Sequence, residues 1–143
     1  ENSNIEIFYS LMQAAFKKIL FSNKELNKTI HRNNEITFSF KELVYKHHTE
    51  NKSVTFYADK LKISVNYLNR CIKQTTGIAP KEWINNVSIL QSQILLQDLT
   101  KDISEIAFAL NYEDPSYFGR LFKKITGTTP SQYRNSLKQD LSE

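Results

Sequence analysis

Arginine and lysine recur at matched positions of two similar segments. The segments YLNRCIKQTTGIAPKEW and YFGRLFKKITGTTPSQY lie fifty positions apart, so that Arg70 and Lys73 are repeated as Arg120 and Lys123. An arginine can bind a guanine edge through two hydrogen bonds, whereas a lysine one turn further along suits a phosphate. This pairing of residue types, written twice, predicts contact with double-stranded DNA.

The stretches that carry these cations contain no acids. Neither 64–76 nor 115–127 has an Asp or Glu, although the whole chain carries a formal charge of only +4. Net charge is therefore a weak argument for any partner, and the placement of the charge is the stronger one. Two locally basic elements favour a nucleic-acid partner over an acidic protein surface.

Composition excludes several classes of protein. The chain has 143 residues, 40% of them hydrophobic, and a single cysteine, which rules out an internal disulfide and fits a reducing cytosol. No apolar run approaches the roughly 20 residues of a membrane span, so we expect no membrane association and a cytoplasmic location. The first residue is not Met, and we expect the chain to be a piece of a longer protein.

Apolar spacing predicts an all-α fold. Val54, Tyr57, Ala58 and Leu61 fall on one helical face, and the same pattern returns 49 positions later from Ile103 to Leu110. A turn of three or four residues and a second helix follow in each copy. Each copy is therefore predicted to be a helix-turn-helix unit.

Capping residues mark where these helices begin and end. Ser53 and Asp102 stand at the starts of the first helices, and Asp102 forms a capping-box pattern with Glu105. Ser64 and Asp114 stand before the second helices. Gly77 and Gly127 follow those helices, where a left-handed residue is wanted.

The units imply a domain organisation. We predict a first unit over about 53–80, a linker helix over about 81–97 and a second unit over about 102–134, all within a domain spanning 36–143. The linker helix is expected to turn Trp83, Val87, Leu90, Ile94 and either Leu95 or Leu96 inward. Residues 1–35 are predicted to be a helical stub of an upstream dimerisation or sensor region, with an amphipathic helix near 5–20 and a polar helix tail or linker over 23–35.

The segment DISEIAFALNYEDPSYFGRLFKKITGTTPSQYR (102–134) resembles the signature of the AraC-type family of bacterial transcription factors. The resemblance extends over roughly 38–134, with 54–77 similar to the first motif of that family. It implies two helix-turn-helix units joined rigidly, with their second helices in successive major grooves about 34 Å apart. It also implies an upstream effector-binding or dimerising domain.

Residues carried over from this resemblance, and from the outward faces of the second helices, form the predicted site. The base-reading positions are Val65, Asn66, Asn69, Arg70, Ser116, Gly119 and Arg120. The phosphate-binding positions are Ser64, Lys73, Gln74, Lys123 and Lys124. Three departures stand out: Asn111 replaces a usual Gly, Gly119 offers no side chain, and Ser88 and Ser92 replace a frequent Arg and Ala.

Other interpretations stay open beside this one. The paired helices could form a protein-interaction module; DNA binding, unlike that module, requires Arg70, Lys73, Arg120 and Lys123 to share one face. Each arginine could instead pair with a neighbouring acid. Further partners that we consider are RNA polymerase and a second copy of the chain, bound through the N-terminal helix or a missing upstream domain.

The sequence offers little for catalysis. His31, His47 and His48 lack the spacing of a metal site, and no phosphate-binding loop or catalytic constellation is visible, so we expect no metal, no cofactor and no enzyme activity. Cys71 lies on the face opposite Arg70, and we expect a buried thiol.

Overall fold

Seven α-helices make up the part of the chain that the structure describes. The computed structural model describes residues 24–140, and the amphipathic helix predicted near 5–20 lies outside them. The helices are α2 (Lys24–His47), α3 (Val54–Lys60), α4 (Val65–Thr76), α5 (Pro80–Leu95), α6 (Ile103–Ala109), α7 (Pro115–Thr126) and α8 (Pro130–Asp140). No strand occurs among these residues, and the predicted all-α class is confirmed.

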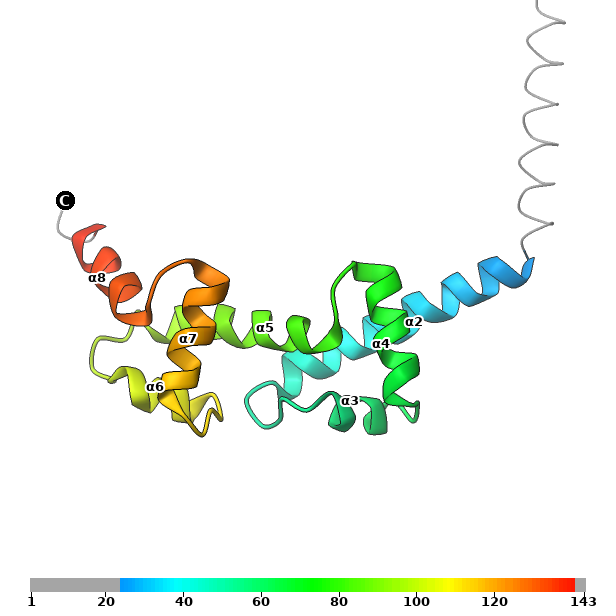
Figure 1. Cartoon of the computed structure of the whole chain (residues 1–143), viewed down its shortest axis with the longest axis horizontal. Helices are drawn as coiled ribbons and strands as arrows, with labels where there is room; N and C mark the ends of the chain where they lie inside the picture. Colours follow the sequence, from blue (N-terminus) through cyan, green and yellow to red (C-terminus); the bar gives the residue numbers. More distant parts are fainter. Residues whose placement is uncertain (1–23, 141–143) are drawn as a thin grey trace, which may run out of the picture.

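The helices form two units joined by α5. Helices α2, α3 and α4 pack around one half of α5, and α6, α7 and α8 gather around its other half (Figure 1). Each unit contains a helix-turn-helix, α3–α4 in the first and α6–α7 in the second. The predicted pair of units on a long linker helix is therefore confirmed.

Local signals set the ends of α4 and α7. The Ser64 hydroxyl accepts a hydrogen bond from the Tyr67 N–H at 3.1 Å, and the Asp114 carboxylate accepts one from the Ser116 N–H at 2.8 Å. Both helices end at a glycine with positive φ, 81° at Gly77 and 86° at Gly127. A side chain there would strain the backbone, so each glycine stops its helix at the same point of the repeat.

The first helices of the two units differ at their starts. Asp102 and Glu105 form the predicted capping box, with each side chain accepting the other residue's N–H at 2.7 Å. Ser53 occupies the corresponding position, but its side chain makes no capping bond. Instead, the Asn51 side chain accepts the Ser53 N–H at 2.8 Å, the same backbone donor that Glu105 binds at Asp102 in the second unit.

Each unit has its own apolar core. Phe40, Tyr57, Leu68, Ile72 and Ile84 are fully buried in the first. The second is built around residues that include Ile106, Leu110, Phe118, Phe122 and Leu96. Ala58 and Ala107 are fully buried within the respective clusters, and their small side chains let the paired helices approach closely.

The buried face of α5 differs from the predicted one. Val87 is buried as expected, but Leu90 and Ile94 are 56% and 55% exposed, so their predicted inward placement is wrong. Because α5 lies between two units, its buried surface passes from Ile84 on the first core to Ile89 on the second. Ser88 and Ser92 are fully buried along this path, and Ser88 accepts a hydrogen bond from the Tyr112 hydroxyl at 3.0 Å.

Helix α2 joins two segments that the sequence pattern separated. It runs without a break through residues 24–35 of the polar stretch, and the predicted domain boundary after residue 35 falls inside it. Asn33, Thr37, Phe40 and Val44 form its buried stripe, of which the first two are polar. A stripe with polar members gives little hydrophobic periodicity, which is why this part of the helix resembled a tail or linker.

Within residues 24–140, no helix combines the length and the apolar composition that crossing a bilayer requires.

Candidate nucleic-acid interface

Helices α4 and α7 present the predicted site residues in the same register. Each helix has 12 residues, and each begins one position after its capping residue. The two helices stand roughly parallel on one side of α5, both pointing from the lower edge of the molecule upward (Figure 1). The fold therefore brings both predicted reading helices to one side of the molecule.

The exposed face of α4 is formed by Asn66, Arg70 and Lys73. Their spacings of four and three residues place them one above another on a helix. The Arg70 guanidinium carbon lies 5.0 Å from the centre of the Tyr67 ring, a cation–π contact that restricts the conformations of the Arg70 side chain. This arrangement leaves the guanidinium donors free to meet a base edge.

A second arginine lies beside the same ring. The Arg32 guanidinium carbon, from α2, is 6.0 Å from the centre of the Tyr67 ring, and its side chain is exposed. Arg32 thus adds a cation to the α4 side of the first unit. The sequence argument missed it because 35 positions separate it from Tyr67 and no local pattern links the two.

The side chains at three other predicted positions of the first unit already make contacts within the protein. Val65 is partly buried against the first core, and the Ser64 hydroxyl is the cap of α4. The Gln74 side-chain oxygen accepts a hydrogen bond from the Asn33 amide at 3.0 Å. Asn69 is partly exposed. The outer face of α4 is therefore narrower than the predicted set of residues.

The exposed face of α7 repeats that of α4, with Ser116, Arg120 and Lys123 at the positions of Asn66, Arg70 and Lys73. Arg120 lies 3.6 Å from the Asp114 carboxylate, which is the acid pairing left open by the sequence. The two side chains are 69% and 56% exposed, and ion pairs this exposed contribute only about 0–1 kcal/mol. The pair therefore leaves Arg120 free to exchange Asp114 for another anion.

Gly119 leaves open space on α7. A Cβ added there would meet no atom within 4 Å, apart from its neighbours in the helix. Its counterpart on α4 is Asn69. The second unit therefore lacks a polar group at one of its predicted reading positions, although the helix has room for one.

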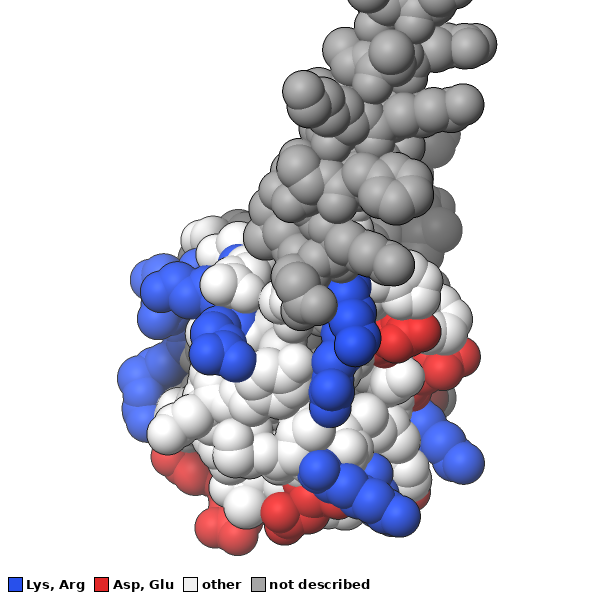
Figure 2. Space-filling view, turned by 90° about the vertical axis from the view of Figure 1, so that its right-hand side faces the viewer, with Lys and Arg blue, Asp and Glu red and all other residues white. Residues whose placement is uncertain are grey.

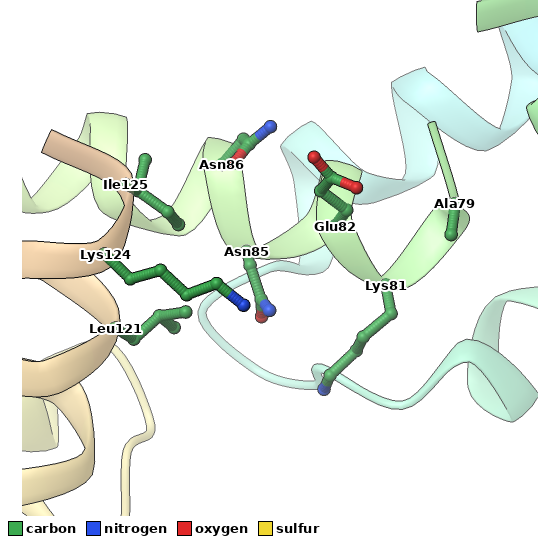
Figure 3. Close-up of a pocket in the computed structure, with 8 residues that line it drawn as sticks. All are labelled: Ala79, Lys81, Glu82, Asn85, Asn86, Leu121, Lys124 and Ile125. Carbon is green, nitrogen blue, oxygen red and sulfur yellow. The ribbon is translucent and has the colours of Figure 1, made fainter. Parts of the chain in front are cut away.

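Lys123 and Lys124 serve different parts of the surface. Figure 3 shows Lys124 extending from α7 toward Asn85, across a hollow of about 690 Å³ between α7 and the first turns of α5. Lys81 lies at the same hollow, where burial lowers its pKa. Consecutive residues on a helix point about 100° apart, so Lys123 stays on the outer face that Arg120 shares.

The charge distribution follows the two helices. Figure 2 views the molecule from the α2 end, so that the side facing the reader in Figure 1 lies on the left. Lys and Arg side chains cover much of that left flank, whereas Asp and Glu appear mainly along the lower edge and on the right (Figure 2). The flank with the cations is the side on which α4 lies.

The described residues contain neither a metal site nor an exposed thiol. No three His, Cys, Asp or Glu side chains of residues 24–140 gather into a metal site. His47 instead pairs with the Glu50 carboxylate at 2.7 Å. Cys71 is fully buried, as predicted, and its thiol donates to the Asn33 side-chain oxygen at 3.1 Å.

Comparison with known proteins agrees with this arrangement. A family model described as a helix-turn-helix domain matches residues 57–136. The uncharacterized HTH-type transcriptional regulator YisR of Bacillus subtilis is 32% identical over 89 residues, which are 62% of this chain and 31% of that protein. The HTH-type transcriptional activator RhaS of Escherichia fergusonii is 26% identical over 92% of this chain and 46% of its own length.

Solved structures share the fold. The C-terminal domain of AraT, a response regulator from Geobacillus stearothermophilus, superimposes with a TM-score of 0.66 at 30% identity, over 71% of this chain and 84% of that one. The DNA-binding domain of AdpA, solved in complex with a target DNA, gives 0.67 at 23% identity, over 73% and 94%.

The paired units define a helix-turn-helix protein of the DNA-binding class. The chain belongs to the AraC-type family of helix-turn-helix transcription regulators. It spans about a third of the length of the first curated relatives that it matches, 31% and 30%.

Proposed function

We propose that this chain binds double-stranded DNA sequence-specifically, with α4 and α7 in successive major grooves on one face of the duplex. It would do so as the DNA-binding part of a longer bacterial transcription regulator that works in the cytoplasm. The first unit contributes most of the sequence readout, and both units contribute phosphate contacts. No step of this function requires a cofactor or a catalytic residue.

One observation carries the proposal: the exposed polar triplet of α4 recurs on α7 in the same register. Asn66, Arg70 and Lys73 correspond to Ser116, Arg120 and Lys123 on two helices that lie parallel on one side of α5 (Figure 1). A scaffold that binds proteins has no need for this repetition. Two helices in successive grooves need it, because each meets the same phosphate geometry.

The residues divide into two kinds of contact. Arg70 with a guanine, and Asn66 or Asn69 with an adenine, would each discriminate against a wrong base by about 1–3 kcal/mol. Lys73, Lys123 and Lys124 would bind phosphates, which fixes the register of the protein without selecting a sequence. Val65 remains a predicted apolar contact, through the part of its side chain that the core leaves exposed.

The test measures the affinity of this chain for mixed-sequence duplexes of about 20 base pairs, long enough to offer two successive major grooves. Fluorescence anisotropy at several salt concentrations should give a linear fall of log affinity with log salt, by about 0.9 for each phosphate bound. Lys101→Ala serves as a charge-matched control, because Lys101 lies in the connection between α5 and α6, outside both helices. Absence of binding at low salt would overturn the proposal for this chain by itself.

The remaining partners stay predictions. Contact with RNA polymerase belongs to the alternative of a protein-interaction module. Pairing with a second copy through the N-terminal helix or an upstream domain is inferred from the family resemblance and from residues outside 24–140. Analytical ultracentrifugation with and without a bound duplex tests the second of these. A monomer at micromolar concentration would place any dimerisation in a part of the protein beyond this chain.

A further inference from the structure

The loop that follows α2 contacts the turn of the second unit. The Asn111 side-chain amide donates to the Glu50 backbone oxygen at 2.8 Å, and the Lys52 ammonium donates to the Leu110 backbone oxygen. Residues 48–53 belong to the first unit, whereas 110–112 form the turn between α6 and α7. These contacts connect the two units directly, in addition to the covalent connection through α5.

Lys52 lies where two helices end. Its ammonium also donates to the His48 backbone oxygen at 3.0 Å. His48 follows the last residue of α2, and Leu110 is the capping residue at the end of α6. Carbonyl groups at helix ends lack partners within the helix and carry the negative end of the helix dipole. One cation therefore satisfies the ends of two helices that belong to different units.

An aromatic ring of the second unit completes the surroundings of Lys52. The ammonium lies 4.3 Å from the centre of the Tyr112 ring, and Tyr112 is fixed in turn by its hydrogen bond to Ser88 on α5. On the other side, the Lys81 ammonium donates to the Lys52 backbone oxygen at 2.9 Å. Lys52 is thus held through both its backbone and its side chain.

The position of Lys52 is unfavourable for a charge by itself. Burial, together with the nearby Lys81, lowers the pKa of Lys52 to about 8. A lysine placed merely for solubility would remain in water at its ordinary pKa. Its contacts with two carbonyl groups and a ring across the two units offset the cost of desolvation.

Asn111 also combines a role in its own turn with a contact to the other unit. Its φ of 59° is left-handed, a conformation that glycine adopts more easily. The matching position of the first unit, Lys62, has a φ of 55°, so the turn itself accepts residues other than glycine. A glycine at position 111 would keep the backbone and lose the hydrogen bond to Glu50.

We propose that Lys52, assisted by Asn111, is a positioning residue that fixes the placement of α7 relative to α4. Through it, the protein would enforce the spacing between the two DNA segments that these helices contact. The inference rests on the proposed function for its consequence on DNA, but the fixed placement is a property of the protein alone. Each unit packs on its own half of α5, and the Lys52 contacts add a direct connection between the two units beside that shared helix.

The first experiment needs no DNA. Spin labels are attached at Asp59→Cys on α3 and Ser104→Cys on α6, two exposed positions, in a Cys71→Ala background. Pulsed electron–electron double resonance then gives the distribution of distances between the two units. Lys52→Met, which keeps most of the apolar stem, should widen this distribution. Lys62→Met, which removes a charge from the corresponding turn of the first unit, should leave it unchanged.

The second experiment uses a duplex selected by this chain from a random pool, with the two contacted segments located by footprinting. One base pair is then inserted between these segments. The insertion should weaken binding by the parent chain more than by Lys52→Met, with penalties that differ by about three- to tenfold, the range expected for the loss of one hydrogen bond. Lys62→Met should show the full penalty of the parent chain.

Asn111→Gly provides an independent variant if Lys52→Met does not fold. It preserves the left-handed backbone and removes only the side-chain amide, so a wider distance distribution and a smaller insertion penalty are expected here too. Unchanged distances in Lys52→Met and Asn111→Gly would overturn the proposal. Wider distances without any DNA binding would uphold the fixed placement and overturn only the proposed function.

Discussion

The two helix-turn-helix units share a backbone and differ in what supports their second helices. Helix α4 is braced by the long α2, through the Asn33 side chain that bonds to Cys71 and Gln74. Helix α7 has no counterpart of α2 among the described residues and is flanked by α6 and the short α8. Its support comes from aromatic side chains instead.

The aromatic side chains of the second unit form a continuous series. Ring centres lie 5.2 Å apart from Tyr112 to Phe118, 5.9 Å from Phe118 to Phe122 and 5.6 Å from Phe122 to Tyr133. At the positions of Phe118 and Phe122 the first unit has Leu68 and Ile72. A larger apolar area per residue compensates for the missing brace.

The exposed faces of α4 and α7 also differ, and here the first unit has the larger set of side chains. Helix α4 carries more polar groups suited to bases, and α7 carries Gly119 and an arginine already paired with Asp114. The comparison teaches that the repeat preserves what the backbone needs, namely caps, glycine stops and buried alanines. The two faces are free to diverge because no packing constrains an exposed position.

The largest effect is expected from the aromatic series. Phe118→Ala should lower the free energy of unfolding by about 3–5 kcal/mol, because it leaves a cavity between the Tyr112 and Phe122 rings. Chemical denaturation followed by circular dichroism measures this. Leu68→Ala at the matched position should cost about 2–5 kcal/mol, at the lower end if α2 closes over the site. Equal losses of unfolding free energy at the two positions would show that the aromatic series stabilises the second unit no more than aliphatic side chains stabilise the first.

The arginines test the difference between the outward faces. Arg70→Ala should weaken binding to the selected duplex by about 1–3 kcal/mol and relax selectivity at one base pair. Arg120→Ala should cost less, since the free protein already offers Asp114 as a partner. Affinities for a set of single-base variants of the duplex measure both. If Arg70→Ala weakened binding to every sequence alike, Arg70 would be a phosphate contact.

The lysines test what the two faces have in common. Lys123→Ala should weaken binding to all sequences alike, by less than Arg70→Ala, and make the slope of log affinity against log salt shallower by about one. Lys73→Ala, its counterpart on α4, should behave the same way. Anisotropy titrations at four salt concentrations suffice. A change of selectivity in either variant would show that the corresponding lysine reads bases.

Gly119 offers a stabilising change. Gly119→Ala should raise the free energy of unfolding by about 0.5–1 kcal/mol, because the alanine lowers the entropy cost of helix formation and its Cβ meets open space. Urea denaturation measures the gain. A loss of stability would mean that α7 bends at this position in solution.

The smallest effect concerns the joint between the units and depends on pH. Between pH 8 and pH 10.5 the unfolded chain holds a proton on Lys52 that the folded chain has lost, because burial lowers the pKa of Lys52 from 10.5 to about 8. The free energy of unfolding should therefore rise with pH in this window, relative to Lys52→Met. Screening of a partly exposed group keeps the gain small. His48 and Lys81 face the same ammonium, but His48, whose pKa is lowered from 6.5, is neutral throughout this window. Burial also lowers the pKa of Lys81, so a matching rise in Lys52→Met would assign the effect to Lys81.

The sequence was sufficient for the parts that local signals control. The caps at Ser64 and Asp114, the capping box at Asp102 and the stops at Gly77 and Gly127 follow from residue types alone, and the structure contains them all. The two helix-turn-helix units could be predicted because those signals occur twice, at nearly constant spacing. A repeat is easier to recognise than any single motif.

The remaining features depend on residues that lie far apart in the chain. The bond from Asn33 to Gln74 spans 41 positions, and the one from Lys52 to Leu110 spans 58. Leu90 and Ile94 have the spacing of a buried stripe yet lie outside, because the position of the second unit around α5 decides which face is covered. No window of local sequence contains that information.

The continuity of α2 has a mechanical consequence. At 24 residues it is a rod about 36 Å long, and its first turns extend beyond the first unit (Figure 1). Asn33 couples this rod to α4, so a torque applied to its N-terminal end is delivered to α4 before it can reach α7. The two units are therefore mechanically unequal. A force on α2 acts directly on the first unit, and it reaches the second unit only through α5 and the loop that carries Lys52.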